Sequence, residues 1–146
     1  MSDAIVVGTD GSDTAGRAVD EAIRMAKALD AEVHIVSAYE PLRNAKIVGA
    51  PEGAAKVWAP LPDTLVNATV DQAAAKVRIS GVGVKTHAVE KDPADALLQV
   101  AEDVGANMIV VGSKGMHGAR RVLGSVPNKV SHQAHCNVLI VSTDRT

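Results

Sequence analysis

Two patterns of apolar residues take turns along this chain: short continuous runs, and longer stripes with helical spacing. The continuous runs are rich in β-branched residues, which is typical of strands that are buried on both faces of a sheet. Five such strands are expected, at residues 5–7, 33–39, 82–89, 108–111 and 138–141.

Between these runs, apolar residues recur every three to four positions, as they do on one face of an amphipathic helix. Four helices are expected, at residues 13–29, 62–78, 92–105 and 125–135. Ser12, Asp92 and Ser125 stand at the start of three of them and are expected to act as N-caps, because their side-chain oxygens can accept hydrogen bonds from the first turn.

The strict alternation of strands and helices predicts one α/β domain over residues 1–146. We expect a doubly wound, five-stranded parallel sheet of strand order 3-2-1-4-5, with helices on both faces. Residues 40–61 interrupt the alternation with three prolines and two glycines, so this segment is predicted to be a long loop or lid. Its Trp58 either anchors the loop on the domain or contacts a ligand.

Composition excludes several functional classes. Aromatic residues make up 1% of the chain and the net charge is -2, which argues against a nucleic-acid partner. No apolar stretch approaches the roughly 20 residues that span a bilayer. No basic region precedes the first apolar run, so the N-terminus does not resemble a signal peptide. The single Cys136 excludes an internal disulfide. A cytoplasmic location is therefore expected.

The predicted strand order brings two polar, glycine-rich segments to one crevice. The first strand leads into Gly8-Thr9-Asp10-Gly11-Ser12, and the fourth leads into Gly112-Ser113-Lys114-Gly115. Ligands of doubly wound sheets bind where the strand order reverses, here between these two strands. A buried strand that opens into glycines before a helix is a typical phosphate-binding arrangement. The sequence therefore predicts a nucleotide site.

The side chains in these segments leave alternatives open. Asp10 either accepts hydrogen bonds from ribose hydroxyls or closes a turn on its own backbone. Lys114, Arg120 and Arg121 either neutralise phosphate or lie in solvent, and Lys114 is the best placed because it lies between two glycines. Neither a G-x-x-x-x-G-K-[ST] loop nor a G-x-G-x-x-G fingerprint occurs.

The remaining candidate side chains are interpreted as structural. His132 and His135 lie three apart on a predicted helix, a spacing that can chelate zinc, but the sequence supplies no further ligand at a matching offset. His34 and His87 fall in predicted strands and are expected to be packing positions. Cys136 is expected to be a small, partly buried apolar residue.

These segments resemble those of universal stress proteins. The resemblance covers nearly the whole chain, including residues 5–12, 92–98 and 112–141, and implies a Rossmann-like fold. Family members that bind ATP carry a G-x2-G-x9-G-[ST] motif, which Gly112, Gly115, Gly124 and Ser125 follow with eight residues in place of nine in the long interval. This departure from the motif is expected to concern the phosphate end of the site more than the adenosine end.

Carried over by position, the resemblance assigns a role to each site residue. Asp10 meets the ribose, the Ala38 backbone bonds the adenine, and Gly112 lies against the sugar. The base and sugar are lined by Gly8, Thr9 and Val111, and the phosphates are held by Gly115, Gly124, Ser125 and Val126, with Lys114 added from the charge argument.

The resemblance also implies a class of function. ATP is the expected ligand, with AMP and cyclic AMP as alternatives, and Mg²⁺ is expected only through the phosphates, beside Asp10 and Asp13. The last strand, Val138 to Val141, is expected to pair two copies into a homodimer. A stress-response regulator that binds adenine nucleotides is favoured over a slow ATP hydrolase or autokinase, because no carboxylate cluster suited to phosphoryl transfer is visible. A scaffold with a vestigial site is the third alternative.

Overall fold

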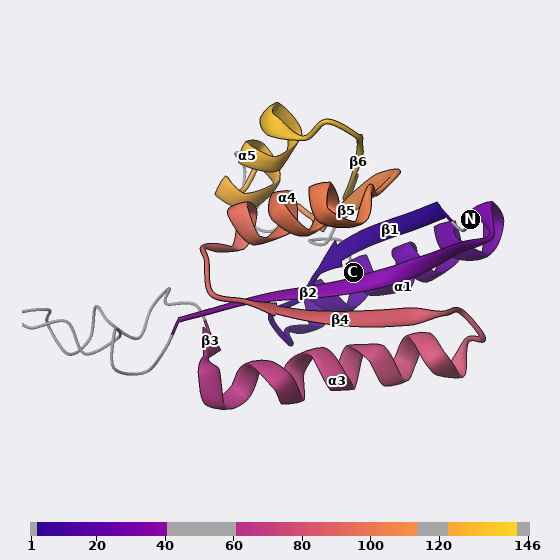
Figure 1. Ribbon diagram of the computed structural model, residues 1–146, viewed down its shortest axis with the longest axis horizontal. Coiled ribbons are helices and arrows are strands. Elements are labelled where there is room, and N and C mark those ends of the chain that lie inside the picture. Colours follow the sequence, from indigo (N-terminus) through magenta and orange to yellow (C-terminus); the bar gives the residue numbers. More distant parts are fainter. Residues whose placement is uncertain (1–2, 41–60, 114–122, 143–146) are drawn as a thin grey trace, which may run out of the picture.

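The computed structural model describes residues 3–40, 61–113 and 123–142 (Figure 1). Its strands are β1 (Asp3–Gly8), β2 (Ala31–Glu40), β3 (Leu61–Pro62), β4 (Val84–Val89), β5 (Met108–Gly112) and β6 (Asn137–Val141). Its helices are α1 (Asp13–Leu29), α3 (Asp63–Ile79), α4 (Pro93–Val104) and α5 (Ser125–Gln133). The five longer strands and the four helices correspond to the elements expected from the hydrophobic pattern.

The five longer strands form a parallel sheet in the order β4-β2-β1-β5-β6. Numbered along the chain without β3, this is the predicted order 3-2-1-4-5, so the fold prediction is confirmed. The two-residue β3 was not expected. It pairs with the end of β2, beyond the residues that pair with β4, and Tyr39 lies opposite Leu61. Pro62 therefore belongs to a strand and not to the following helix.

Two helices cover each face of the sheet, and each face has its own core. Alternate residues of β1 and β2, such as Ile5 and Ile35, pack under α1 and α3. Their neighbours Val6 and Val36 pack on the opposite face, under α4 and α5. The central strands are buried on both faces because crossover helices lie on both sides of a parallel sheet.

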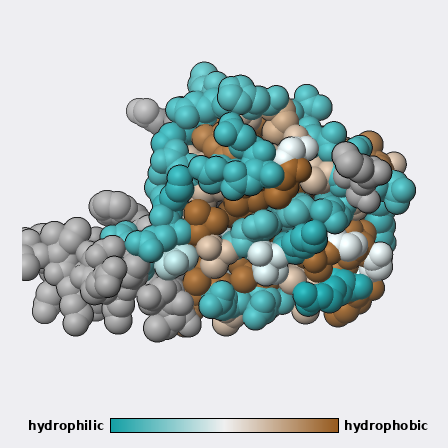
Figure 2. Space-filling model, in the orientation of Figure 1, coloured by the Kyte–Doolittle hydropathy of each residue, from teal (hydrophilic) through white to brown (hydrophobic). Residues whose placement is uncertain are grey.

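Coverage of the α4 and α5 face is incomplete beside β4. The upper part of Figure 2 is largely hydrophilic over these two helices, and hydrophobic atoms are visible in a band between α4 and β4. On that strand Lys85 is exposed, and His87 and Val89 are only half-buried. β4 is thus an edge strand with one partly open face.

Two expectations concern segments that the description covers only in part. Both ends of the predicted loop or lid at 40–61 differ from expectation, because Glu40 still belongs to β2 and Leu61 already belongs to β3. Residues 41–60, including Trp58, lie outside the described residues, and so the interpretation of Trp58 stays a prediction. No helix in the described ranges is both long and apolar enough to cross a bilayer.

The interpretation of His34 and His87 as packing positions was incomplete. His34 is buried, but its ring is hydrogen-bonded at both nitrogens, to Glu32 and to His87. Cys136 is half-buried against the core under α4 and α5, as expected, and burial raises the pKa of its thiol, which lowers its reactivity at neutral pH.

Candidate functional site

The carboxyl ends of β2, β1 and β5 lie side by side at one edge of the sheet. Gly8 at the end of β1 is in register with Val36 of β2, and Val7 with Val110 of β5. Helices leave β1 and β5 toward opposite faces of the sheet, so the strand order reverses between these two strands. The first glycine-rich segment and the start of the second therefore meet at the switch point, where such sheets bind ligands.

The loop that follows β1 is held by its own side chains. Thr9 Oγ1 accepts a hydrogen bond from the Gly11 amide at 3.1 Å, and Asp10 Oδ1 accepts one from the Ser12 amide at 3.0 Å. Gly11 has a φ of 85°, a backbone conformation that disfavours other residues. The turn expected as one alternative for Asp10 is therefore present. Its carboxylate is nevertheless exposed, and so the ribose role stays a prediction.

Ser37 fixes this loop to the neighbouring strand, a role that the sequence analysis missed. The Thr9 amide donates to the Val36 carbonyl at 2.9 Å, and the buried Ser37 hydroxyl donates to the Thr9 carbonyl at 2.8 Å. A serine next to the predicted adenine contact Ala38, at the end of the apolar part of β2, was the available signal. The backbone of the predicted ribose loop is thereby tied to the strand of the predicted adenine contact.

Gly8 has a packing role that is independent of any ligand. A Cβ atom added at this position would lie 3.2 Å from one methyl carbon of Leu97 and 3.3 Å from the other. Leu97 belongs to α4, and its side chain would have to shift by a few tenths of an ångström to accept a Cβ atom at residue 8. The absence of a side chain at Gly8 therefore favours the close packing of Leu97 on the end of β1.

On the β5 side, the described residues extend to Ser113, at the start of the predicted phosphate loop. Val111 and Ser113 are buried and Gly112 is half-buried, and the Ser113 amide donates to the Val141 carbonyl of β6 at 2.8 Å. Lys114, Gly115 and the two arginines 120 and 121 lie outside the described residues. Their predicted phosphate contacts stay predictions.

The far side of the phosphate loop is the start of α5, where the expected cap is wrong. Ser125 is the first helical residue, and the N-cap is Gly124, with φ −63° and ψ 164° and no side-chain cap hydrogen bond. A serine inside the helix cannot cap it, because an N-cap side chain must bend back from a non-helical residue. Ser125 is exposed, and the side chain of Val126 packs against the core.

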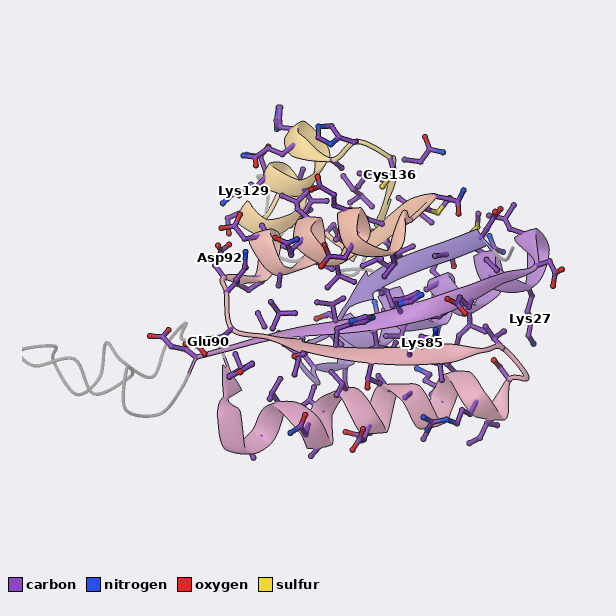
Figure 3. All side chains as sticks on the ribbon, viewed as in Figure 1. Lys27, Lys85, Glu90, Asp92, Lys129 and Cys136 are labelled. Carbon is purple, nitrogen blue, oxygen red and sulfur yellow. The ribbon has the colours of Figure 1, made fainter. Side chains whose placement is uncertain are left out.

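An ion-pair cluster joins the starts of α4 and α5 (Figure 3). Asp92 caps α4 by accepting from the Asp95 amide, and Asp95 is 2.9 Å from Lys129 Nζ of α5. The hydrogen bond between the two carboxyl groups raises the pKa of Asp92 and lowers that of Asp95, and the Asp95 carboxylate raises the pKa of Lys129. The ammonium of Lys129 is thus engaged by a carboxylate of its own chain.

The described residues offer little for a metal ion. No three His, Cys, Asp or Glu side chains gather as a metal site within the described ranges. α5 ends at Gln133, so His135 lies outside the helix expected to carry both histidines, and His132 Nδ1 is 2.8 Å from the Asn128 carbonyl oxygen. The exposed or capping role predicted for these histidines agrees with this geometry.

The doubly wound parallel sheet, with the loop after β1 and the end of β5 side by side at its switch point, defines a Rossmann-like α/β protein. The universal stress protein family model matches residues 1–142, and the chain therefore belongs to this family. It is 40% identical over 147 residues to universal stress protein Rv1636 of Mycobacterium tuberculosis, covering 95% of each chain. It is 37% identical over 143 residues to universal stress protein MJ0531 of Methanocaldococcus jannaschii, covering 94% of this chain and 80% of that protein.

A solved structure adds a ligand to this comparison. A universal stress protein crystallised in complex with cAMP superposes with a TM-score of 0.76 at 32% identity, covering 98% of both chains. An adenine nucleotide thus binds to at least one protein of this family and fold.

Proposed function

We propose that this protein binds an adenine nucleotide, with ATP as the principal ligand, across the carboxyl ends of β1 and β5, and that it acts as a cytoplasmic stress-response regulator. The start of α5 carries this proposal. Of the three helices with a described N-cap, α1 and α4 are capped by Ser12 and Asp92, and α5 has no side-chain cap. Backbone amides at such a start can bind an anion, which the helix dipole also favours.

The local sequence of α5 limits which backbone amides can donate hydrogen bonds to a phosphate. Pro127 is the third helical residue and has no N–H, and the Asn128 amide already donates to the Gly124 carbonyl at 3.0 Å. The amides of Ser125 and Val126 are therefore the first-turn donors assigned to phosphate. Because Lys129 forms an ion pair with Asp95, we assign the phosphate contact at this helix start mainly to backbone N–H groups and less to the described charged side chains.

The proposal favours a regulator over an enzyme. Phosphoryl transfer needs metal ligands and a group that orients the nucleophile. Asp10 and Asp13 are both exposed acidic residues near the switch point, and no acidic residue lies in the first turn of α5. Mg²⁺ would therefore be bound through the phosphates of the nucleotide more than through the protein. A slow hydrolase or autokinase is the second candidate.

Ligand release and titration test the proposal. We expect mass spectrometry of denatured protein to detect an adenine nucleotide, and calorimetry to give tighter binding for ATP than for AMP or cyclic AMP. Asp10→Ala should weaken binding about tenfold or more, since a hydrogen bond to a charged group contributes about 1.5–3 kcal/mol. Asp3→Ala, which removes the same charge at the opposite end of β1, is the matched control and should bind normally.

The outcomes separate the candidates. Equal affinity in both aspartate variants and wild type would remove the ribose contact from the site. ATP turnover within the usual kinase range of about 1–100 per second would replace the regulator with the enzyme.

We also propose that two copies pair through β6. Within the described sheet β6 pairs only with β5, and its Ile140 is 36% exposed. An apolar edge strand of this kind is open to pairing with another strand. Ile140→Lys should shift sedimentation from dimer to monomer. Ile79→Lys is the control, because Ile79 is 87% exposed on α3 and lies far from this edge in the sheet order. A dimer that persists in Ile140→Lys contradicts the proposed interface.

A further inference from the structure

The side chain of Ser37 lies in the interior of the domain, one residue before the predicted adenine contact Ala38. It is 2% exposed, and Val33 and Ile35, which alternate with it along β2, belong to the core under α1 and α3. A hydroxyl in such a place needs a partner, because a buried polar group without one destabilises the fold. Its partner is the Thr9 carbonyl oxygen, at 2.8 Å.

This hydrogen bond continues the contact between β1 and β2 past the end of their strand pairing. The ladder of the two strands ends where Gly8 is in register with Val36. One residue further, the Thr9 amide still donates to the Val36 carbonyl at 2.9 Å. The next described hydrogen bond between the two segments is made by the Ser37 hydroxyl. Both polar groups of the Thr9 backbone, its N–H and its C=O, are thereby bonded to β2.

The Thr9 carbonyl is the group through which β2 can orient Asp10. A peptide unit is planar, so the Thr9 carbonyl and the Asp10 amide share one plane, which ends at the Asp10 Cα atom. A bond to the Thr9 oxygen therefore restricts the direction in which the Asp10 side chain leaves the backbone. The hydrogen bonds from the Gly11 amide to Thr9 Oγ1 and from the Ser12 amide to Asp10 Oδ1 join residues two apart. These two bonds shape the turn but do not attach it to the sheet.

We propose that Ser37 is a positioning residue for the nucleoside end of the site, where it holds the Asp10 carboxylate at the distance from the Ala38 backbone that a ribonucleoside requires. This inference rests on the proposed nucleotide site. Ser37 acts through the peptide between Thr9 and Asp10, and not by touching the ligand. The group that the site recognises is then the base and sugar together. Affinity for a ribonucleoside depends on Ser37, and affinity for the free base does not.

Titration with adenosine and with adenine tests this role, because the two ligands differ by the ribose. Ser37→Ala should weaken adenosine binding about fivefold, the effect expected for one neutral hydrogen bond, and leave adenine binding unchanged. Ser37→Thr keeps a hydroxyl at this position and should restore the wild-type affinity.

Ser80→Ala is the matched control. The Ser80 hydroxyl also donates to a backbone carbonyl, that of Val77, but it lies between the end of α3 and the amino end of β4. The carboxyl ends of the strands, where the nucleotide site is proposed, are at the opposite side of the sheet. Ser80→Ala should therefore bind adenosine as wild type does.

A double-mutant comparison separates a positioning role from a general loss of structure. If Ser37 acts through Asp10, Ser37→Ala should have almost no further effect on adenosine affinity once Asp10→Ala is present. Two independent effects that multiply would contradict the proposal. Relaxation measurements on the ligand-free protein give a second readout. Backbone order parameters of Asp10 and Gly11 should fall in Ser37→Ala and keep their wild-type values in Ser80→Ala.

The remaining outcomes separate this inference from the proposed function. Equal adenosine affinity in Ser37→Ala and wild type would overturn the positioning role and leave the nucleotide site in place. An equal loss for adenine and adenosine would also overturn it, because the substitution would then disturb β2 as a whole. Wild type that binds neither adenosine nor ATP would remove the proposed nucleotide site, and the positioning role with it.

A second pair of variants keeps the test decisive if Ser37→Ala does not fold. Ser37→Thr and Ser37→Val introduce side chains of the same shape, one with a hydroxyl and one without. Only Ser37→Thr should bind adenosine with the wild-type affinity. Equal adenosine binding by both variants would contradict the role of the hydroxyl.

Discussion

The starts of α4 and α5 lie next to each other and are built in opposite ways. α4 begins with Asp92, whose carboxylate accepts from the first turn, and has Pro93 and Asp95 behind it. α5 begins with Gly124, which has no side chain to offer, and no acidic residue follows in its first turn. The positive end of the α4 dipole faces carboxylates of its own first turn, and the N-cap and first turn of α5 supply no such carboxylate.

Backbone strain does not explain the glycine of α5. Gly124 has φ −63° and ψ 164°, an extended conformation that any residue adopts. Gly11, by contrast, has a φ of 85°, and Gly8 lies against Leu97. Glycine is also an acceptable N-cap, only a few tenths of a kcal/mol less favourable than Asp, Asn or Ser. Capping therefore permits this glycine without requiring it, and close approach of a phosphate is the use that we propose for it.

The largest change in ATP affinity is expected when the N-cap of α5 is replaced by the residue type that caps α4. Gly124→Asp supplies a capping carboxylate in an allowed conformation, so the melting temperature should stay the same or increase slightly. ATP affinity should fall about a hundredfold, because two unit charges about 4 Å apart repel by about 4 kcal/mol near a protein surface before salt screening. Calorimetry with ATP and with adenosine measures the difference, and adenosine should lose little.

The reciprocal change supplies the control. Asp92→Ala removes the cap of α4 and should cost about 1 kcal/mol of unfolding free energy, with ATP affinity unchanged. Equal ATP affinity in Gly124→Asp and wild type would show that phosphate does not bind at the start of α5. A loss of affinity in Asp92→Ala would show that the two helix starts are not separate.

The capped start of α4 could be predicted from the sequence and the uncapped start of α5 could not, and the reasons are physical. Asp92-Pro93 marked the start of α4, because cap and proline act within a single turn. At α5, Ser125 has the right residue type for a cap, and only the backbone conformation of Gly124 shows that the helix begins one residue earlier. Strand order followed from alternation and crossover handedness, since these constrain the whole chain.

Contacts between distant residues could not be predicted in the same way. Ser37 and Thr9, or His34 and His87, are joined only after the register of two strands is fixed, and a shift of one residue turns each side chain to the other face. The same holds for the packing of Leu97 over Gly8. A polar residue in an apolar strand is a usable signal, but its partner lies on another strand.

A smaller effect separates the two kinds of donor at the start of α5. Ser125→Pro removes one backbone N–H from the first helical position, where proline is favoured, and Gly124 already has the extended conformation that a following proline requires. Ser125→Ala keeps the N–H and removes the hydroxyl. If main-chain donors hold the phosphates, ATP affinity falls about tenfold in Ser125→Pro and stays near wild type in Ser125→Ala, with equal melting temperatures. The reverse order of affinities would assign the phosphate contact to the serine hydroxyl. A side chain, and not the backbone, would then carry the chemistry at the start of α5, as the Asp92 carboxylate does at the start of α4.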